Sequence, residues 1–238
     1  MLPTSDHTDA VEGGDRRVAA FFDVDNTIVR GAAVFHIAVG LFRRGFVTPL
    51  RVLRWGVHQA RYRTFGENRE AMDSVRAGAL RVIEGHSVDE MRSLAEDIYD
   101  EVLQLRIFPG TRRLLDGHLA AGHEVWLVTA GPDDVADLIA RRLGVTGAIG
   151  TAIEKEDGRY TGRLVGEMLH GEVKAVALER LAQRERIDLA SSYAYGDSIH
   201  DVAALSLVGH PVAINPDRRL RRHATRVGWP VHDFTTRG

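Results

Sequence analysis

The spacing of apolar and polar positions changes twice along the chain. A first apolar run, Ala19 to Phe22, stops abruptly at Asp23 and Asp25, and its aromatic content predicts a short strand buried on both faces. After Thr27 the apolar residues follow helical spacing for about eighty residues. Beyond Pro109, short apolar runs alternate with helical segments. The pattern therefore predicts one buried strand, an inserted helical region and a longer α/β region.

Four segments of the inserted region have apolar residues at helical spacing, with no strand between them. They are residues 31–42, 50–63, 67–84 and 87–105. The last begins with Ser87-Val88-Asp89-Glu90, which is typical of a capping box. Helices without intervening strands indicate a separate small bundle. We therefore divide the chain into a disordered lead-in (1–17), an α/β core (18–30 and 108–238) and a helical domain (31–107).

Single helices separate the strands of the α/β region. Strands are predicted at 124–129, 191–195 and 211–214, and helices at 111–121, 133–143, 172–186 and 217–225. Residues 147–153 and 160–164 flank Asp157-Gly158, a dipeptide that favours a hairpin turn. Strands joined by single helices predict an α/β fold with a doubly wound, mainly parallel, Rossmann-like sheet.

Composition narrows the possible functions. The 238 residues include no cysteine, which excludes disulfides and thiolate metal sites and makes a reducing cytoplasm the expected location. The net charge of −2 gives no argument for nucleic-acid binding. The longest apolar stretch, residues 31–42, is too short to cross a bilayer, so we expect no transmembrane segment.

Charge is distributed unevenly over the helical domain. Residues 26–66 contain no acidic side chain but several arginines, whereas residues 67–101 are acidic. The arginines are Arg30, Arg43, Arg44, Arg51, Arg54, Arg61 and Arg63. We favour the interpretation that the two halves are solvated faces that attract each other. The alternative is a basic surface for an anionic substrate or a phospholipid headgroup.

Polar residues follow three of the predicted strands, where the carboxyl ends of parallel strands share one edge. They are Asp23 and Asp25, Thr129, and Asp197 with Asp201, while Lys174 lies at the start of a helix. Taken singly, each has a simpler explanation, such as a helix cap for Thr129 or an exposed lysine for Lys174. Together they suit phosphoryl transfer, in which one carboxylate attacks phosphorus and others hold Mg²⁺.

The need for several charged groups follows from electrostatics. A carboxylate approaching a phosphate dianion meets a repulsion of about 4 kcal/mol per charge pair at 4 Å and an effective dielectric constant of 20. One Mg²⁺ and one ammonium group supply the positive charge that cancels this repulsion.

These residues form four ordered motifs that resemble those of the haloacid dehalogenase-like (HAD) hydrolase superfamily. The motifs are Asp23-Val24-Asp25-Asn26-Thr27, Thr129, Lys174 and Gly196-Asp197-Ser198-Ile199-His200-Asp201. The helical insert after the first motif resembles the cap of the phosphoserine-phosphatase-like branch (subfamily IB). The resemblance covers about residues 18–231 and implies a Mg²⁺-dependent phosphatase.

By position, the resemblance implies a role for each residue. Asp23 would be the nucleophile and a metal ligand, Asp25 the general acid and base, and Asp197 an acidic ligand of Mg²⁺. The backbone carbonyl of Asp25 would also bind the metal. Thr129 and the main chain of Ala130 and Gly131 would bind phosphate. Lys174 would neutralise the nucleophile and the phosphate, and Asp201 would support Lys174 or the metal. For His200 we favour a surface position over a contact with the site.

The sequence after the first motif departs from the pattern of phosphoserine phosphatases, which bears on the expected substrate. Phosphoserine phosphatases carry an acidic residue shortly after the first motif, where this chain has Arg30-Gly31-Ala32-Ala33. We therefore expect a small phosphorylated metabolite other than phosphoserine, such as a sugar, polyol or lysophospholipid phosphate. Two alternatives stay open: a phosphotransferase that uses the same aspartyl-phosphate, and a catalytically silent module that binds phosphate or lipid headgroups.

Overall fold

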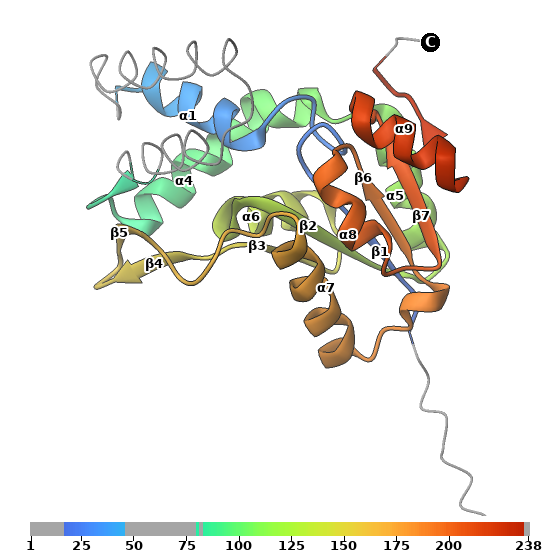
Figure 1. Cartoon of the computed structure of the whole chain (residues 1–238). Coiled ribbons are helices and arrows are strands. Elements are labelled where there is room, and N and C mark those ends of the chain that lie inside the picture. Colours follow the sequence, from blue (N-terminus) through green and yellow to red (C-terminus); the bar gives the residue numbers. More distant parts are fainter. Residues whose placement is uncertain (1–16, 46–79, 81–82, 236–238) are drawn as a thin grey trace, which may run out of the picture.

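A six-stranded parallel sheet forms the centre of the computed structural model, which describes residues 17–45, 80 and 83–235 (Figure 1). The strand order is β3-β2-β1-β6-β7-β8, and every pair of neighbours is parallel. The strands are β1 (Ala19–Phe22), β2 (Glu124–Pro132), β3 (Gly147–Thr151), β6 (Tyr193–Gly196), β7 (His210–Ile214) and β8 (Val231–His232). The predicted doubly wound, mainly parallel sheet is confirmed.

The two faces of the sheet are covered by different helices. Phe22 packs into a core with α5 (Pro109–Ala120) and α6 (Asp133–Leu143). Its neighbour Phe21 packs on the opposite face with α7 (Glu172–Glu185), α8 (Val202–Leu205) and α9 (Arg218–Val227). Because successive side chains of a strand point to opposite faces, this arrangement buries all four residues of β1, as predicted.

The helix predictions in the α/β region agree with the structure to within a few residues, which is the usual uncertainty at helix ends. One strand begins later than predicted. Residues Leu189–Ser191 form a 3₁₀ turn, because the Asp188 carboxylate accepts a hydrogen bond from the Ala190 amide at 3.1 Å. The strand itself starts at Tyr193.

The predicted hairpin exists, but its first strand lies further along the chain than the predicted residues 147–153. It consists of β4 (Ile153–Glu156) and β5 (Arg159–Leu164), joined by Asp157 and Gly158 with φ angles of 49° and 74°. Residues 147–151 instead form the edge strand β3 of the main sheet. A Cβ on Gly147 would meet the Trp126 ring at 2.5 Å, so the glycine permits this close pairing with β2.

The described helical insert contains α1 (Ala33–Arg43) and α4 (Val88–Ile98), followed by a π-helical turn (Tyr99–Leu103) and a 3₁₀ turn (Gln104–Arg106). The helices predicted at its two ends are therefore confirmed, although the last one is not α-helical throughout. The Ser87 hydroxyl caps α4 by accepting from the Glu90 amide at 3.5 Å. The helix predicted at 50–63 and most of that at 67–84 lie outside the described residues.

The described part of the insert shares an apolar core with the sheet. Ile37 and Leu41 of α1 belong to the same cluster of buried side chains as Phe22. Arg44 forms an ion pair with Glu101 at 2.7 Å, which joins the basic and acidic halves of the insert at this point. Arg51, Arg54, Arg61 and Arg63 lie outside the described residues. Within the described ranges, no helix is both long enough and apolar enough to pass through a bilayer.

Candidate functional site

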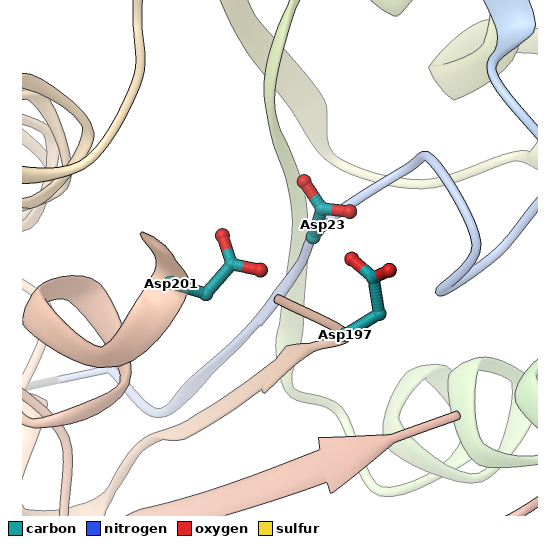
Figure 2. Close-up of side chains that lie close together, drawn as sticks. All are labelled: Asp23, Asp197 and Asp201. Atoms are coloured by element: carbon teal, nitrogen blue, oxygen red, sulfur yellow. The ribbon is translucent and has the colours of Figure 1, made fainter. Parts of the chain in front are cut away.

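The central strands bring the predicted site residues to one edge of the sheet. Asp23 directly follows β1, Asp197 directly follows β6, and Thr129 lies in β2, so the three come from neighbouring strands. Figure 2 shows the carboxylates of Asp23, Asp197 and Asp201 converging from the strand ends and the adjoining 3₁₀ turn. One oxygen of each lies within 4.8 Å of one oxygen of each of the other two.

Lys174 forms two short ion pairs in this cluster. Its Nζ donates to Asp23 Oδ1 at 2.6 Å and to Asp201 Oδ1 at 2.7 Å. The lysine residue is only 5% exposed. Burial by itself would lower the pKa of Lys174, but the two carboxylates outweigh burial and raise it above its usual range. Lys174 is therefore a fixed positive charge beside the Asp23 carboxylate.

The cluster contains three carboxylates but only one lysine, so its negative charge is not fully balanced by the protein. Burial, and then the neighbouring Asp201, raise the pKa of Asp197 to about 7. Burial also raises the pKa of Asp23, against the opposing pull of Lys174. Buried carboxylates that share one lysine are costly unless a further cation joins them. Their oxygen atoms are the hard ligands that Mg²⁺ prefers, so the donor set fits this ion.

Asp201 is arranged as a support for the cluster. Its Oδ1 binds Lys174, while its Oδ2 accepts from the Ser198 amide at 3.1 Å. This second bond belongs to a capping box that closes the turn between Asp197 and Asp201. Both oxygens are thus engaged by the protein, whereas Asp197 is held mainly through its backbone.

Asp25 and Thr129 lie in the same part of the fold but have partners of their own. Asp25 Oδ1 accepts from the Ala33 amide at 2.8 Å, which links the carboxylate to the first turn of α1. Burial raises the pKa of Asp25, although the Ala33 hydrogen bond opposes the shift. The Thr129 hydroxyl accepts from the Gly131 amide at 3.0 Å, and the Ala130 carbonyl accepts from the Thr151 hydroxyl. The segment Thr129–Gly131 is therefore an irregular, internally bonded part of β2, where the register with β3 shifts.

Two residues that hold the loops of the site were not predicted from the sequence. Asn215 donates from Nδ2 to the Asn26 carbonyl at 2.8 Å and accepts at Oδ1 from the Phe234 amide at 2.6 Å. Asp217 accepts from the Ile199 amide at 3.0 Å, and its own amide donates to the Asp197 carbonyl at 2.7 Å. The signal available was weak: Asp217 precedes a basic helix as an N-cap would, and Asn215 precedes a proline.

His200, which we assigned to the surface, is exposed and its ring lies 4.4 Å from that of His170. Its backbone amide donates to Ser198 Oγ at 3.3 Å. Its surface position agrees with the sequence analysis.

Comparison with known proteins identifies the family of the chain. The family model described as haloacid dehalogenase-like hydrolase matches residues 20–206. The phosphoserine phosphatase SerB1 of Mycobacterium tuberculosis is 50% identical over 232 residues, covering 94% of this chain and 75% of the relative. A histidinol-phosphatase of Neisseria meningitidis is 29% identical over 219 residues, covering 90% of this chain and 98% of the relative.

A solved structure agrees over nearly the whole chain. The crystal structure of a protein of unknown function from Bordetella pertussis superposes with a TM-score of 0.81 at 32% identity, covering 92% of this chain and 99% of that one. The family match and the relatives show that the chain belongs to the haloacid dehalogenase-like hydrolase family. It is a phosphatase of that family, acting on a small phosphorylated compound.

Proposed function

We propose that the chain hydrolyses a small phosphomonoester through an aspartyl-phosphate formed on Asp23, in a reaction that requires Mg²⁺. The observation that carries this proposal is the double ion pair of Lys174 with Asp23 and Asp201, at 2.6 and 2.7 Å. A buried lysine that neutralises one carboxylate of a cluster is what nucleophilic attack on a phosphate dianion requires.

In the first step, Asp23 attacks phosphorus. Lys174 holds Oδ1, so Oδ2 is the oxygen that forms the bond to phosphorus while the ester oxygen leaves. Asp25 gives a proton to that leaving oxygen, so that a neutral alcohol is released. Burial raises the pKa of Asp25, which suits a group that must carry a proton at the start of the reaction.

In the second step, water attacks the phosphorus of the aspartyl-phosphate. Asp25, now ionised, takes a proton from the water, and the bond between phosphorus and Asp23 breaks to restore the carboxylate. Lys174 stabilises the negative charge on the phosphoryl group during the attack and on the Asp23 carboxylate when it is released. Inorganic phosphate is the product.

Phosphate would be held by the irregular end of β2, residues 129–131. The Thr129 hydroxyl and the main-chain N–H groups of Ala130 and Gly131 are the donors we assign to the phosphoryl oxygens. Because the Gly131 amide donates to Thr129 Oγ1 in the structure, we expect this hydrogen bond to be exchanged for one to phosphate when substrate binds.

Asp23, Asp197 and the Asp25 carbonyl are the ligands we assign to Mg²⁺, with Asp201 as a support. When bound, the ion would neutralise charge on the phosphoryl group. The convergence of Asp23 and Asp197 oxygens within 4.8 Å and the raised pKa of Asp197 both support a cation at this position.

We assign residues 31–107 to a cap and residues 18–30 and 108–238 to the core domain. The cap begins next to the site, because Asp25 accepts from the Ala33 amide at the start of α1. The substrate's organic portion would lie between the two. The described residues that directly follow the first motif, Arg30 to Ala33, include no acid, so we propose a substrate without an ammonium group in this position.

The test of the chemistry is release of phosphate from p-nitrophenyl phosphate. We expect turnover with Mg²⁺, none with EDTA, and a loss of at least about a thousandfold in kcat for Asp23→Asn, since the nucleophile is removed. The matched control is Asp188→Asn, which alters a carboxylate remote from the site in the 3₁₀ turn before β6. Equal activity of Asp23→Asn and the native chain would refute the proposal.

The test of the substrate is a panel of natural phosphomonoesters. Phosphoserine and histidinol phosphate are the compounds in the names of two relatives, and both carry an amine. Sugar, polyol and lysophospholipid phosphates are the alternatives that we favour. A kcat/KM for phosphoserine above that of all amine-free esters would show our substrate proposal to be wrong, while leaving the chemistry intact.

A further inference from the structure

A groove with a volume of about 490 Å³ lies away from the site described above. It is lined by Tyr99, Asp100, Gln104, Pro109, Arg112 and Arg142, together with apolar side chains. None of the residues that we assign to catalysis lines it. Its lining residues come from the π-helical turn after α4, the start of α5 and the end of α6. Its volume falls within the usual range for small-molecule sites.

Tyr99 is the most informative residue of this groove. The residue is only 4% exposed, and its hydroxyl makes no hydrogen bond among the described residues. The hydroxyl is not one of their fully buried unsatisfied polar atoms, so it is open to solvent. A phenol that lines a groove and makes no hydrogen bond to the protein can donate one to a ligand. Burial raises the pKa of Tyr99 against the pull of Arg112 and Arg142, so the neutral phenol is a hydrogen-bond donor.

Two guanidinium groups line the groove together with the phenol. The Arg142 guanidinium carbon lies 5.9 Å from the centre of the Tyr99 ring, and both Arg112 and Arg142 act electrostatically on the hydroxyl. Arg142 donates to Asp100 through NH2 at 2.8 Å, and Arg112 binds Asp116. Because Asp116 does not line the groove, the lining carries two positive charges and one negative charge.

The backbone at this point is also unusual. Tyr99–Leu103 is the one π-helical turn of the described residues, and π turns within helices are frequent at functional sites. The turn places Tyr99 and Asp100 at its start, so both contribute to the groove.

We propose that this groove is a second binding site, for the phosphate group of a small molecule. The phenol and the guanidinium groups donate hydrogen bonds, and phosphate oxygens accept them, as in other arginine-based phosphate sites. Ile107 and Leu143 supply apolar surface for an attached organic group. Inorganic phosphate and a phosphomonoester share this chemistry. Because the groove joins the end of the helical insert to α5 and α6, its occupant would contact both parts of the chain.

The test is calorimetric titration of the full chain with inorganic phosphate in EDTA. Without a divalent cation, the carboxylates around Lys174 repel phosphate, so the titration reports the groove. We expect one equivalent to bind, and affinity to fall at least about tenfold in Tyr99→Phe and in Arg142→Gln, because each loses a hydrogen bond to a charged ligand. Tyr99→Phe removes only one oxygen, and an unchanged Tm would show that it folds.

Two further variants separate binding from structure. Asp100→Asn removes the carboxylate that competes for Arg142, so we expect it to bind phosphate several-fold more tightly, which a merely structural role would not produce. Arg141→Gln changes the adjacent arginine of α6, which does not line the groove, and should bind as the native chain does. Tighter binding of n-propylphosphonate than of phosphate would identify an ester as the ligand, and equal binding would identify free phosphate.

The proposal would be overturned by an absence of binding, by binding that Tyr99→Phe leaves unchanged, or by weaker binding in Asp100→Asn. Loss of binding in Lys174→Gln would assign the phosphate to the other site and would overturn it too. None of these measurements depends on turnover, so their outcome is independent of the function proposed above.

Discussion

Lys174 Nζ lies 2.6 Å from Asp23 Oδ1, although 151 positions separate the two residues in the chain. The contact joins the end of the central strand to the first turn of α7. Because Lys174 is buried and the Asp23 side chain is only 11% exposed, little solvent competes with the carboxylate for the ammonium group. The same ammonium group also binds Asp201, so removal of the Lys174 side chain would leave two carboxylates without their counterion.

We predict that Lys174→Gln abolishes measurable phosphatase activity and lowers the free energy of unfolding by about 3–5 kcal/mol at neutral pH, since breaking a buried ion pair strands its charged partner. Chemical denaturation measures the loss. Mg²⁺ should stabilise this variant more than the native chain, because the ion replaces part of the missing charge. Lys155→Gln, which removes the chain's other lysine at a partly exposed position, is the control and should retain full activity.

Saturating Mg²⁺ should stabilise the native chain by about 2.7 kcal/mol at a concentration one hundred times Kd, as expected for an ion that binds only the folded state. Asp197→Asn should remove most of this gain, because it replaces a carboxylate ligand with a neutral amide. Thermal unfolding with and without the ion measures both effects. An equal Mg²⁺ shift in the variant and the native chain would show that Asp197 is not a ligand.

Asn215 should affect turnover without touching substrate. Asn215→Asp keeps the acceptor for the Phe234 amide and tolerates the observed φ of 46°, but it loses the donor to the Asn26 carbonyl. We expect kcat to fall about tenfold with little change in KM, because the loop that carries Asp25 is no longer held in place. Steady-state kinetics on p-nitrophenyl phosphate measure this split. A change in KM alone would argue against a positioning role.

His118 should make stability depend on pH. Its Nε2 lies 2.7 Å from the Tyr195 hydroxyl and its Nδ1 lies 2.9 Å from His123 Nδ1. Burial, and then the neighbouring His123, lower the pKa of His118 to about 4. At His118 the unfolded chain therefore binds more protons than the folded chain between about pH 6.5 and pH 4, so the contribution of His118 to stability falls as pH falls through this window. The raised pKa values of Asp23, Asp25 and Asp197 act in the opposite sense, so the His118 contribution is the difference between the native chain and a His118 variant.

The expected loss is about 2–3 kcal/mol across that window. His118→Gln should remove this contribution, because glutamine cannot take up a proton but can still bond Tyr195. The stability of the variant relative to the native chain should therefore rise as pH falls. Unfolding at a series of pH values measures the slope. The exposed His232→Gln variant serves as the control and should keep the native pH dependence. A native slope in His118→Gln would show that other groups cause it.

The sequence alone determined the elements that local pattern specifies. The apolar run before Asp23 predicted a buried central strand, and Asp157-Gly158 predicted the hairpin turn, because burial and turn geometry are properties of neighbouring residues. The four ordered motifs also indicated the family that the comparisons establish. Those predictions required no knowledge of which distant residues would meet.

The tertiary structure decided the contacts between distant segments. Residues 147–151 pair with β2 in the main sheet. The two oxygens of Asp201 bind Lys174 and the Ser198 amide, and Asn215 donates a hydrogen bond to the loop after Asp23. The tertiary structure also brought Tyr99 and two arginines together in one groove. Such contacts depend on how whole strands and helices pack, since hydrogen-bond geometry is set by distances of a few ångström that spacing along a chain does not specify.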